Sequence, residues 1–193
     1  MDPMIRFAEL LAQAEKTPGI AEPTGMTLST VGADGRPSAR IMLLKGVDAG
    51  GLVFYTNYTS RKGREVVARP DVALTFWWQP LEVQVRFEGR ATQVGAAEAD
   101  AYFASRPRIS QLGAWASHQS QPLKAREELL ERYAALEKQS QGKPVPRPPH
   151  WGGFRVAPLA AEFWKGSEGR LHHRELYTRV TPSAAWTMTL LNP

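Results

Sequence analysis

The stretch LEVQVRFEGRATQV (residues 81–94) shows the clearest alternation of side chains in the sequence. Apolar and polar residues take turns along its first part: Leu81, Val83, Val85 and Phe87 are apolar, and Glu82, Gln84, Arg86 and Glu88 are polar. Because successive side chains of a β-strand point to opposite faces, the pattern predicts a strand with one buried face. Burial on one side only is typical of an antiparallel sheet.

Short apolar or β-branched runs lie on both sides of this stretch, separated by turn signals such as ADGRP and DAGG. They are MTLSTVG (26–32), ARIMLLKGV (39–47), GLVFYTN (51–57), VALTFWW (72–78), FRVAPLAAEFWKG (154–166), RLHHRELYTRV (170–180) and AWTMTLL (185–191). The first three predict an antiparallel meander. Many short strands with a few helices between them predict a mainly β, α+β fold, namely a closed or nearly closed barrel with peripheral helices.

Helical periodicity marks most of the remaining chain. A first helix is expected at about residues 4–16, and a helical insertion at about 96–140. In the last helix of the insertion, the residues expected to point inward are Leu130, Tyr133 and Leu136. With closing strands at about 153–191, the pattern predicts a single domain over residues 1–193.

The composition is that of an ordinary globular protein, with 42% hydrophobic and 22% charged residues among 193. No run of about 18 apolar residues occurs and the N-terminus lacks the layout of a secretory signal, so we expect no membrane span and a cytoplasmic location. The absence of cysteine excludes disulfides, thiolate catalysis and cysteine-bound metals. The net charge of +5 comes without a lysine/arginine block or a nucleic-acid motif, so nucleic acid is not an expected partner.

Common catalytic signatures are missing from the sequence: GxxxxGK[ST], GxGxxG, HExxH and GxSxG do not occur. The four histidines lack the spacing of a metal site, so no metal is expected. What recurs instead is arginine, lysine, serine and threonine beside aromatic residues. Such combinations are typical of a site for a planar, phosphorylated molecule.

Two clusters are candidates for binding a phosphate. SRKGR (60–64) begins with a serine that can cap a helix over 61–69, and the free N–H groups of a helix start favour an anion. The alternative is an ordinary basic first turn. In the second cluster, Tyr102 and Arg106 lie four residues apart on one predicted helix face, with Ser110 just beyond. A surface tyrosine–arginine stack explains that spacing equally well.

A third cationic stretch, RLHHRELYTR (170–179), lies in a predicted strand near the C-terminus. Strand alternation would place Arg170, His172 and Arg174 on one face. Such a row can bind an anion and hold an imidazole beside the chemistry. A solvated basic edge strand is the alternative, since charged residues also protect exposed sheet edges.

From about Phe7 to the C-terminus, the chain resembles the pyridoxamine 5′-phosphate oxidase family. The resemblance is carried by RIMLLKG (40–46), VFYTNYTSRKG (53–63), YFASRPRISQLGAWASHQS (102–120), HWGGFRV (150–156) and EFWKGSEGRLHHRELY (162–177). It implies an FMN-binding split β-barrel and a homodimer with FMN at the subunit interface. The implied activity, part of vitamin B6 metabolism, is oxidation of pyridoxamine or pyridoxine 5′-phosphate to pyridoxal 5′-phosphate, with O2 as acceptor and H2O2 as by-product.

The resemblance also implies roles for individual residues. The implied FMN contacts are Arg40, Ile41, Met42, Leu43, Leu44, Lys45, Tyr55, Thr56, Arg61, Lys62, Gln84, Gln119, Ser120, Trp164 and Arg174. The implied substrate contacts are Lys45, Tyr102, Arg106, Ser110, Arg170 and His172, of which Arg170 and His172 are also the implied catalytic residues. SRKGR would then hold the flavin phosphate, and the cluster from Tyr102 to Ser110 would hold the substrate phosphate.

The sequence departs from the family pattern in a few places. Val83 stands where arginine is usual, His173 where aspartate is usual, and the C-terminus ends in LLNP rather than RLAP. The short N-terminus also lacks an arginine-rich segment that closes over substrate in some members. Two alternatives stay open: a related flavin oxidase with a different substrate, and a non-catalytic protein that holds FMN or pyridoxal 5′-phosphate.

Overall fold

The sheet is organised around β6 (Val83–Gln93), which pairs with β5 (Asp71–Trp78) on one side and β7 (Trp151–Lys165) on the other. These elements come from a computed structural model that describes residues 2–193. The predicted alternation is confirmed from Val83 to Phe87, where every second side chain is buried in the barrel. The polar side chains between them lie on the outer face of the sheet. The prediction is wrong for Leu81 and Glu82, which lie in a 3-10 turn and at its left-handed end.

Within the described residues, the nine-stranded sheet has the order β2-β1-β5-β6-β7-β4-β3, with β8 paired to β7 and β9 to β8. All of these pairs are antiparallel. The remaining strands are β1 (Gly25–Val31), β2 (Pro37–Leu43), β3 (Gly46–Asp48), β4 (Gly51–Asn57), β8 (His173–Thr178) and β9 (Thr187–Leu190).

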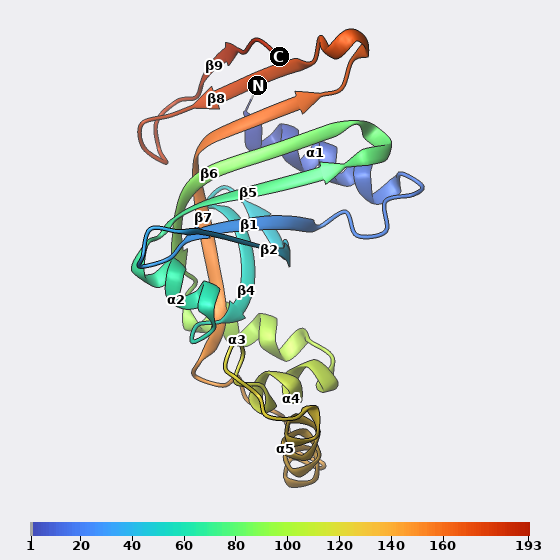
Figure 1. Ribbon diagram of the computed structural model, residues 1–193, viewed down its shortest axis with the longest axis vertical. Helices are drawn as coiled ribbons and strands as arrows, with labels where there is room; N and C mark the ends of the chain where they lie inside the picture. The colour runs from blue at the N-terminus through green and yellow to red at the C-terminus, as the bar shows by residue number, and fades with distance from the viewer. Residues whose placement is uncertain (1) are drawn as a thin grey trace.

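The two ends of the main path, β2 and β3, are joined directly by Leu44 and Lys45. The N–H of Leu44 donates to the carbonyl of Thr24 at 2.9 Å, and the N–H of Lys45 donates to the carbonyl of Val53 at 2.8 Å. The link is therefore hydrogen-bonded to the residue before β1 on one side and to β4 on the other. It holds the curled sheet nearly closed, as a split barrel (Figure 1). The predicted meander is confirmed for the pairs β1–β2 and β3–β4, but β2 and β3 lie at opposite ends of the path.

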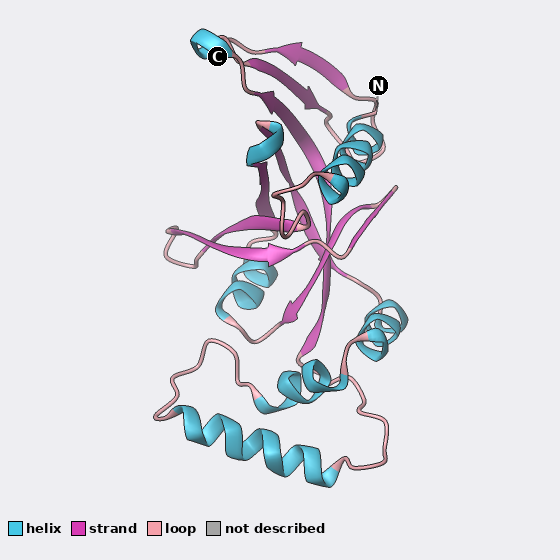
Figure 2. Ribbon diagram, turned by 90° about the vertical axis from the view of Figure 1, so that its right-hand side faces the viewer, coloured by secondary structure: helices cyan, strands magenta, loops and turns pink. Residues whose placement is uncertain are grey.

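Helices lie around the sheet and at one end of it. They are α1 (Pro3–Lys16), α2 (Arg61–Ala68), α3 (Ala96–Ser105), α4 (Arg108–Ala116) and α5 (Arg126–Gln139). Figures 1 and 2 show α3, α4 and α5 gathered at one end of the molecule, while β8 and β9 lie at the opposite end. None of the helices in residues 2–193 is long and apolar enough to cross a membrane.

Helix α1 is fixed to the inner face of the sheet by one aromatic and one charged residue. The Phe7 ring is fully buried and lies 4.9 Å from the ring of Phe87, in an edge-on arrangement. Burial of a side chain of this size contributes about 2–3 kcal/mol. Arg6 stands 4.3 Å above the ring of Phe163 and donates to Glu175 at 2.6 Å, so α1 is also tied to β8.

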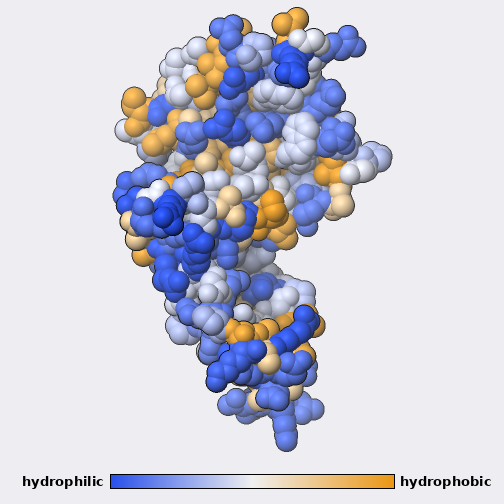
Figure 3. Space-filling view, in the orientation of Figure 1, coloured by the Kyte–Doolittle hydropathy of each residue, from blue (hydrophilic) through white to orange (hydrophobic). Residues whose placement is uncertain are grey.

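A second, smaller core holds the helical end together. Its buried members are Phe103, Leu112, Val145 and Trp151. Tyr133 and Leu136 of α5 pack against it, as predicted. The prediction for Leu130 is wrong: it is 53% exposed, because α5 packs along one side only and its other side faces solvent. Figure 3 shows a largely hydrophilic surface at this end of the molecule.

The stretch RLHHRELYTR is only partly a strand. β8 begins at His173, and the residues before it form a 3-10 turn in which Gly169 and Arg170 have φ values of 63° and 62°. The prediction that Arg170, His172 and Arg174 share one face of a continuous strand is therefore wrong. The left-handed backbone of the turn breaks the extended chain before His172.

Candidate functional site

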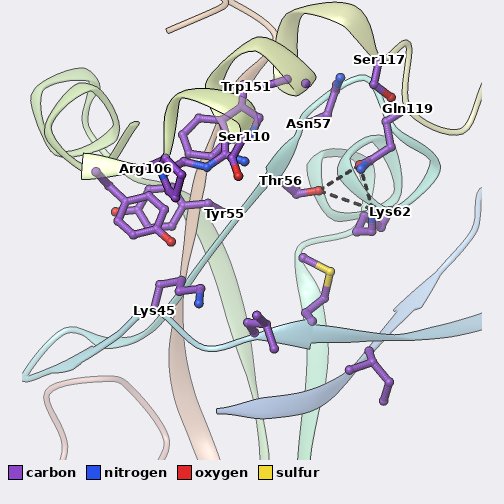
Figure 4. Close-up of a pocket in the computed structure, with 17 residues that line it drawn as sticks. Lys45, Tyr55, Thr56, Asn57, Lys62, Arg106, Ser110, Ser117, Gln119 and Trp151 are labelled. Carbon is purple, nitrogen blue, oxygen red and sulfur yellow. Dashed lines mark hydrogen bonds between the residues drawn. The ribbon is translucent and has the colours of Figure 1, made fainter. Parts of the chain in front are cut away.

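A cavity of about 660 Å³ opens where the β2–β3 link and β4 face α3 and α4. Figure 4 shows its cationic side chains on different sides, with Arg106 and Lys45 on one side and Lys62 on the other. This volume is large enough for a small organic ligand. The full lining is Ile41, Met42, Leu43, Lys45, Tyr55, Thr56, Asn57, Lys62, Tyr102, Arg106, Pro107, Ser110, Gly113, Ala114, Ser117, Gln119 and Trp151.

Three aromatic rings form one wall of the cavity. Tyr55 of β4 stacks on Tyr102 of α3 with ring centroids 3.9 Å apart and an interplanar angle of 14°. The Tyr55 ring also stacks with that of Trp151, with ring centroids 5.4 Å apart and an interplanar angle of 10°. Burial raises the pKa of both tyrosines, so their hydroxyls remain donors at neutral pH. The wall is suited to a planar ring that carries polar substituents.

Arg106 ends α3 and turns its guanidinium towards this wall. It lies 4.7 Å from the ring centroid of Trp151, and its Nη1 is buried with no hydrogen-bond partner in residues 2–193. Burial lowers the pKa of Arg106, since its charge is removed from water. Leaving such a donor unpaired costs about 1–3 kcal/mol. An anion bound between Arg106 and Ser110, which lines the same cavity, would remove that cost.

Lys62 supplies the cation on the other side. Its Nζ donates to Oε1 of Gln119 at 3.0 Å and to Oγ1 of Thr56 at 3.4 Å (Figure 4). Burial and the nearby charge of Arg40 lower the pKa of Lys62, against an opposing effect of Glu65. Because its hydrogen-bond partners are neutral, Lys62 can attract an anion from the cavity.

The start of α2 places Lys62 at the cavity. The predicted cap is confirmed, since the Oγ of Ser60 accepts from the N–H of Gly63 at 3.2 Å. A side chain at Gly63 would meet the carbonyl oxygens of Asn57 and Tyr58 at 2.5 Å. Glycine therefore lets the first turn of α2 press against the end of β4.

Arg40 and Arg61 are held by a buried carboxylate and do not line the cavity. Glu65 accepts from Nε of Arg61 at 2.8 Å, from Nη2 of Arg40 at 3.2 Å and from Oγ1 of Thr30 at 2.5 Å. Burial alone would raise the pKa of Glu65, but these hydrogen bonds and charges lower it overall. Leu44 is likewise outside the cavity, because its side chain is buried in the barrel core.

A second group of predicted site residues lies on the outer face of the sheet. Gln84 of β6 is opposite Trp164 of β7, which is opposite Arg174 of β8, so the three form one row across the strands. The imidazole of His172 lies 4.5 Å from the Trp164 ring, and Arg170 is exposed nearby in the chain. Figures 1 and 2 place β8 at the end of the molecule away from α3 and α4, so this group does not reach the cavity of the same chain.

The orientation of His172 is set by the turn before it. The backbone N–H of Ser167 donates to Nδ1 of His172 at 3.2 Å. A neutral imidazole that accepts at Nδ1 carries its proton on Nε2. His172 is therefore arranged to donate a hydrogen bond from Nε2.

The two internal departures from the family pattern lie at one small cavity, on either side of Lys165 in the strand register. Val83 and His173 both line a cavity of about 210 Å³ beneath α1, together with Arg6, Phe163 and Lys165. Arg6 and Lys165 supply positive charge at this cavity. An uncharged valine at position 83 avoids adding a further cation to it.

The structure thus brings most of the predicted site residues into one cavity. They are Ile41, Met42, Leu43, Lys45, Tyr55, Thr56, Lys62, Tyr102, Arg106, Ser110 and Gln119. Outside it lie Arg40, Leu44, Arg61, Gln84, Ser120, Trp164, Arg170, His172 and Arg174. Cavity residues that the sequence analysis missed are Asn57, Pro107, Gly113, Ala114, Ser117 and Trp151. All six fall inside the segments that carry the resemblance, and that position was the available signal.

Two family profiles match the chain. The profile described as pyridoxamine 5′-phosphate oxidase matches residues 12–140, and that described as the pyridoxine 5′-phosphate oxidase C-terminal dimerisation region matches residues 151–193. The first contains the whole lining of the large cavity up to Gln119. The second contains Trp164, His172 and Arg174.

Individual proteins agree with this assignment. Two relatives are named pyridoxine/pyridoxamine 5′-phosphate oxidase, and both match over the whole of this chain. The protein from Myxococcus xanthus (strain DK1622) is 57% identical, with 92% of its own length covered. The protein from Rubrobacter xylanophilus is 55% identical, with 87% of its own length covered. PhzG from Burkholderia lata 383, solved with tetrahydrophenazine-1-carboxylic acid, has a TM-score of 0.92 at 34% identity and covers 99% of this chain and 92% of PhzG. An FMN-binding protein from Nostoc punctiforme PCC 73102 shares the fold, with a TM-score of 0.78 at 17% identity over 100% of this chain and 99% of that protein. The chain belongs to the pyridoxamine 5′-phosphate oxidase family.

Proposed function

We propose that this protein is an FMN-dependent oxidase that converts pyridoxamine or pyridoxine 5′-phosphate into pyridoxal 5′-phosphate, with O2 as acceptor and H2O2 as by-product. The observation that carries the proposal is the buried, unpartnered Nη1 of Arg106 on one side of an aromatic-walled cavity that has Lys62 on the other. Each cationic side would bind the phosphate of one molecule: FMN at Lys62 and the substrate at Arg106. The names of the relatives at 57% and 55% identity support the same activity.

The residues present fit FMN. Lys62, Thr56 and Gln119 form a polar, cationic end that suits a phosphate, and residues 41–43 of β2 also line the cavity. Tyr55 adds a flat surface at which a ring system can lie. These residues would hold the cofactor, which when bound supplies the two-electron acceptor that O2 can restore.

The substrate phosphate is assigned to Arg106 and its neighbours. The guanidinium has a buried donor to spare, Tyr102 keeps its hydroxyl proton, and Ser110 adds a second hydroxyl from α4. Lys45 lies on the same side of the cavity in Figure 4. Charge-assisted hydrogen bonds of this kind favour a phosphate over a neutral substituent.

A second copy of the chain would complete the site. Gln84, Trp164 and Arg174 form a row at the end of the molecule away from the cavity, so they can contribute only to a site on another copy. Exposed apolar side chains on the strands of that end, Trp77 and Leu190, favour burial against a partner. The match of residues 151–193 to a dimerisation region supports a homodimer. In that homodimer FMN would lie at the interface, between the cavity of one copy and this row of the other.

Arg170 and His172 would meet the substrate from this second copy. Loss of a hydride from C4′ and a proton from the hydroxyl group converts the alcohol substrate directly into the aldehyde. The amine substrate loses the same hydride and a proton from its amine to give an imine, which water hydrolyses to the aldehyde with release of ammonia. Arg170, which is exposed and cationic, would orient the substrate and stabilise developing negative charge. His172 presents Nε2–H and would position the substrate by donating a hydrogen bond.

The direct test is product formation by the purified protein. Pyridoxine and pyridoxamine 5′-phosphate should both yield pyridoxal 5′-phosphate with one H2O2 per turnover, whereas pyridoxine without phosphate should be a poor substrate. Turnover of tetrahydrophenazine-1-carboxylic acid instead would favour the alternative of a related flavin oxidase, the ligand being the one seen in PhzG. FMN binding without turnover of any of these compounds would favour the non-catalytic alternative.

A further inference from the structure

We propose that Glu162 is a positioning residue that fixes the guanidinium of Arg174 for contact with the flavin. The proposal rests on the proposed function, which assigns Arg174 to the cofactor. The sequence analysis gave Glu162 no role, although it is the first residue of a segment that carries the family resemblance. Its role becomes visible only from its contacts across β7 and β8.

Glu162 is a nearly buried carboxylate with two arginine partners. Its side chain is 9% exposed, and its Oε1 accepts from both Nε and Nη2 of Arg174 at 2.9 Å. Its Oε2 accepts from Nη1 of Arg86 at 3.3 Å. A carboxylate removed from water in this way is stable only while cations satisfy it.

The contacts of Arg174 engage all three of its guanidinium nitrogens and leave two of its five N–H donors without a partner in residues 2–193. Nη1 of Arg174 also donates to the backbone carbonyl of Asn192 at 3.0 Å, so Glu162 and Asn192 together restrain the guanidinium. The Arg174 side chain stays partly exposed beside Trp164, its neighbour in the strand register. A long arginine side chain would otherwise sample many rotamers, so this restraint prepares it for a ligand.

Glu162 also limits the positive charge at this surface. Arg86 and Arg174 share its carboxylate, and Arg86 has a second acidic partner in Glu88 at 2.9 Å. Replacing Glu162 by glutamine keeps the shape of the side chain but removes its charge. Arg174 would then lose its strongest restraint, and the surface that faces the flavin would gain a net positive charge.

The test is FMN binding and flavin reduction potential in four forms of the full-length holoenzyme: wild type, Glu162→Gln, Arg174→Ala and the double variant. In Glu162→Gln we expect the Kd for FMN to rise by about tenfold, as for one misplaced charge-assisted hydrogen bond, and the flavin potential to shift upward with the added positive charge. In the Arg174→Ala background, the same substitution should change the Kd less than about twofold, because its effect passes through Arg174. An equal change in both backgrounds, or no change in either, would overturn the proposal.

Glu88→Gln is the matched control, since Glu88 contacts Arg86 on the same face but makes no contact with Arg174. It should leave the Kd for FMN at its wild-type value, because the restraint on Arg174 is intact; a rise in Kd as large as that of Glu162→Gln would overturn the proposal. If Glu162→Gln fails to fold, Glu162→Asp replaces it, because aspartate keeps the charge but has a shorter side chain. A Kd for FMN between those of wild type and Arg174→Ala would then support the proposal, and a wild-type Kd would contradict it. Wild-type protein that binds no FMN would instead remove the proposed function itself.

Discussion

The guanidinium of Arg106 lies 4.7 Å from the ring centroid of Trp151, yet its buried Nη1 has no hydrogen-bond partner among the described residues. This pairing of an apolar contact with an unsatisfied donor indicates a residue arranged for a ligand rather than for stability. In Arg106→Met, we expect KM for pyridoxine 5′-phosphate to rise by about tenfold or more, as for loss of a charge-assisted contact. The free energy of unfolding should stay the same or rise by about 1 kcal/mol, because the orphaned donor is gone.

Steady-state kinetics and urea unfolding of this one variant check both statements. The phosphate-free substrate is the internal control, since its KM should be unaffected by Arg106→Met. An equal loss for both substrates, or a fall in stability of several kcal/mol, would show that Arg106 is a structural residue.

Arg170 is expected to affect turnover more than folding or cofactor binding. It is exposed and lies in a turn with a positive φ of 62°, an unusual backbone state for a residue other than glycine. Arg170→Ala should lower kcat by about a hundredfold, as for removal of one preorganised electrostatic contact, with FMN still bound at its wild-type ratio. The flavin absorbance of the purified variant checks this, and a preparation that loses its flavin would rule out the assigned role.

The contact between α1 and β8 should make stability depend on acidic pH. Burial alone would raise the pKa of Glu175, but hydrogen bonds from Arg6, Tyr177 and His173 lower it from 4.5 to about 2. Because the folded pKa is depressed, the ionised carboxylate stabilises the protein above pH 4.5, and this contribution is lost as the pH falls towards 2. Its size is at most about 3 kcal/mol.

Urea unfolding at pH 6 and pH 3 tests this contact. The difference in unfolding free energy between wild type and Glu175→Gln should shrink by about half on going to pH 3. At that pH the carboxyl of the unfolded chain is largely protonated, whereas that of the folded protein is still largely ionised. A difference that stays constant across this range would mean that Glu175 does not contribute through its charge.

Val83 and His173 should be energetically coupled, because they line the same small cavity. Val83→Arg alone adds a cation beside Arg6 and Lys165 and should destabilise the protein by about 2–4 kcal/mol, as for an unpaired buried charge. Adding His173→Asp supplies an opposite charge across the cavity and should recover at least half of the loss. A double-mutant cycle by urea unfolding checks the coupling, and strictly additive changes would contradict it.

The sequence predicted the strands well where local pattern alone decides them. β4 spans the same residues as the apolar run GLVFYTN, and β6 follows the predicted alternation except at Leu81 and Glu82, which precede the strand. The start of β8 could not be predicted in this way. The left-handed backbone at Gly169 and Arg170 leaves no signal in a stretch whose composition also suits a strand.

The candidate site was predicted in pieces rather than as a whole. The clusters at Lys62 and Arg106 were visible in the sequence, but only the fold shows that they share one cavity. Arg40 stays a predicted cofactor contact, and its hydrogen bond to Glu65, 25 residues away in the chain, has no signal in the local sequence. Trp151 was missed because it ends a proline-rich loop, and its packing with Tyr55 and Arg106 depends on β4 and β7 being neighbours.

The most direct test of the proposed oxidase activity is the visible spectrum of the purified protein before and after anaerobic addition of pyridoxine 5′-phosphate. We expect a bound-flavin spectrum that bleaches on mixing and returns when air is admitted, as pyridoxal 5′-phosphate accumulates. A flavin spectrum that stays unchanged with this substrate and with pyridoxamine 5′-phosphate would contradict the proposed activity.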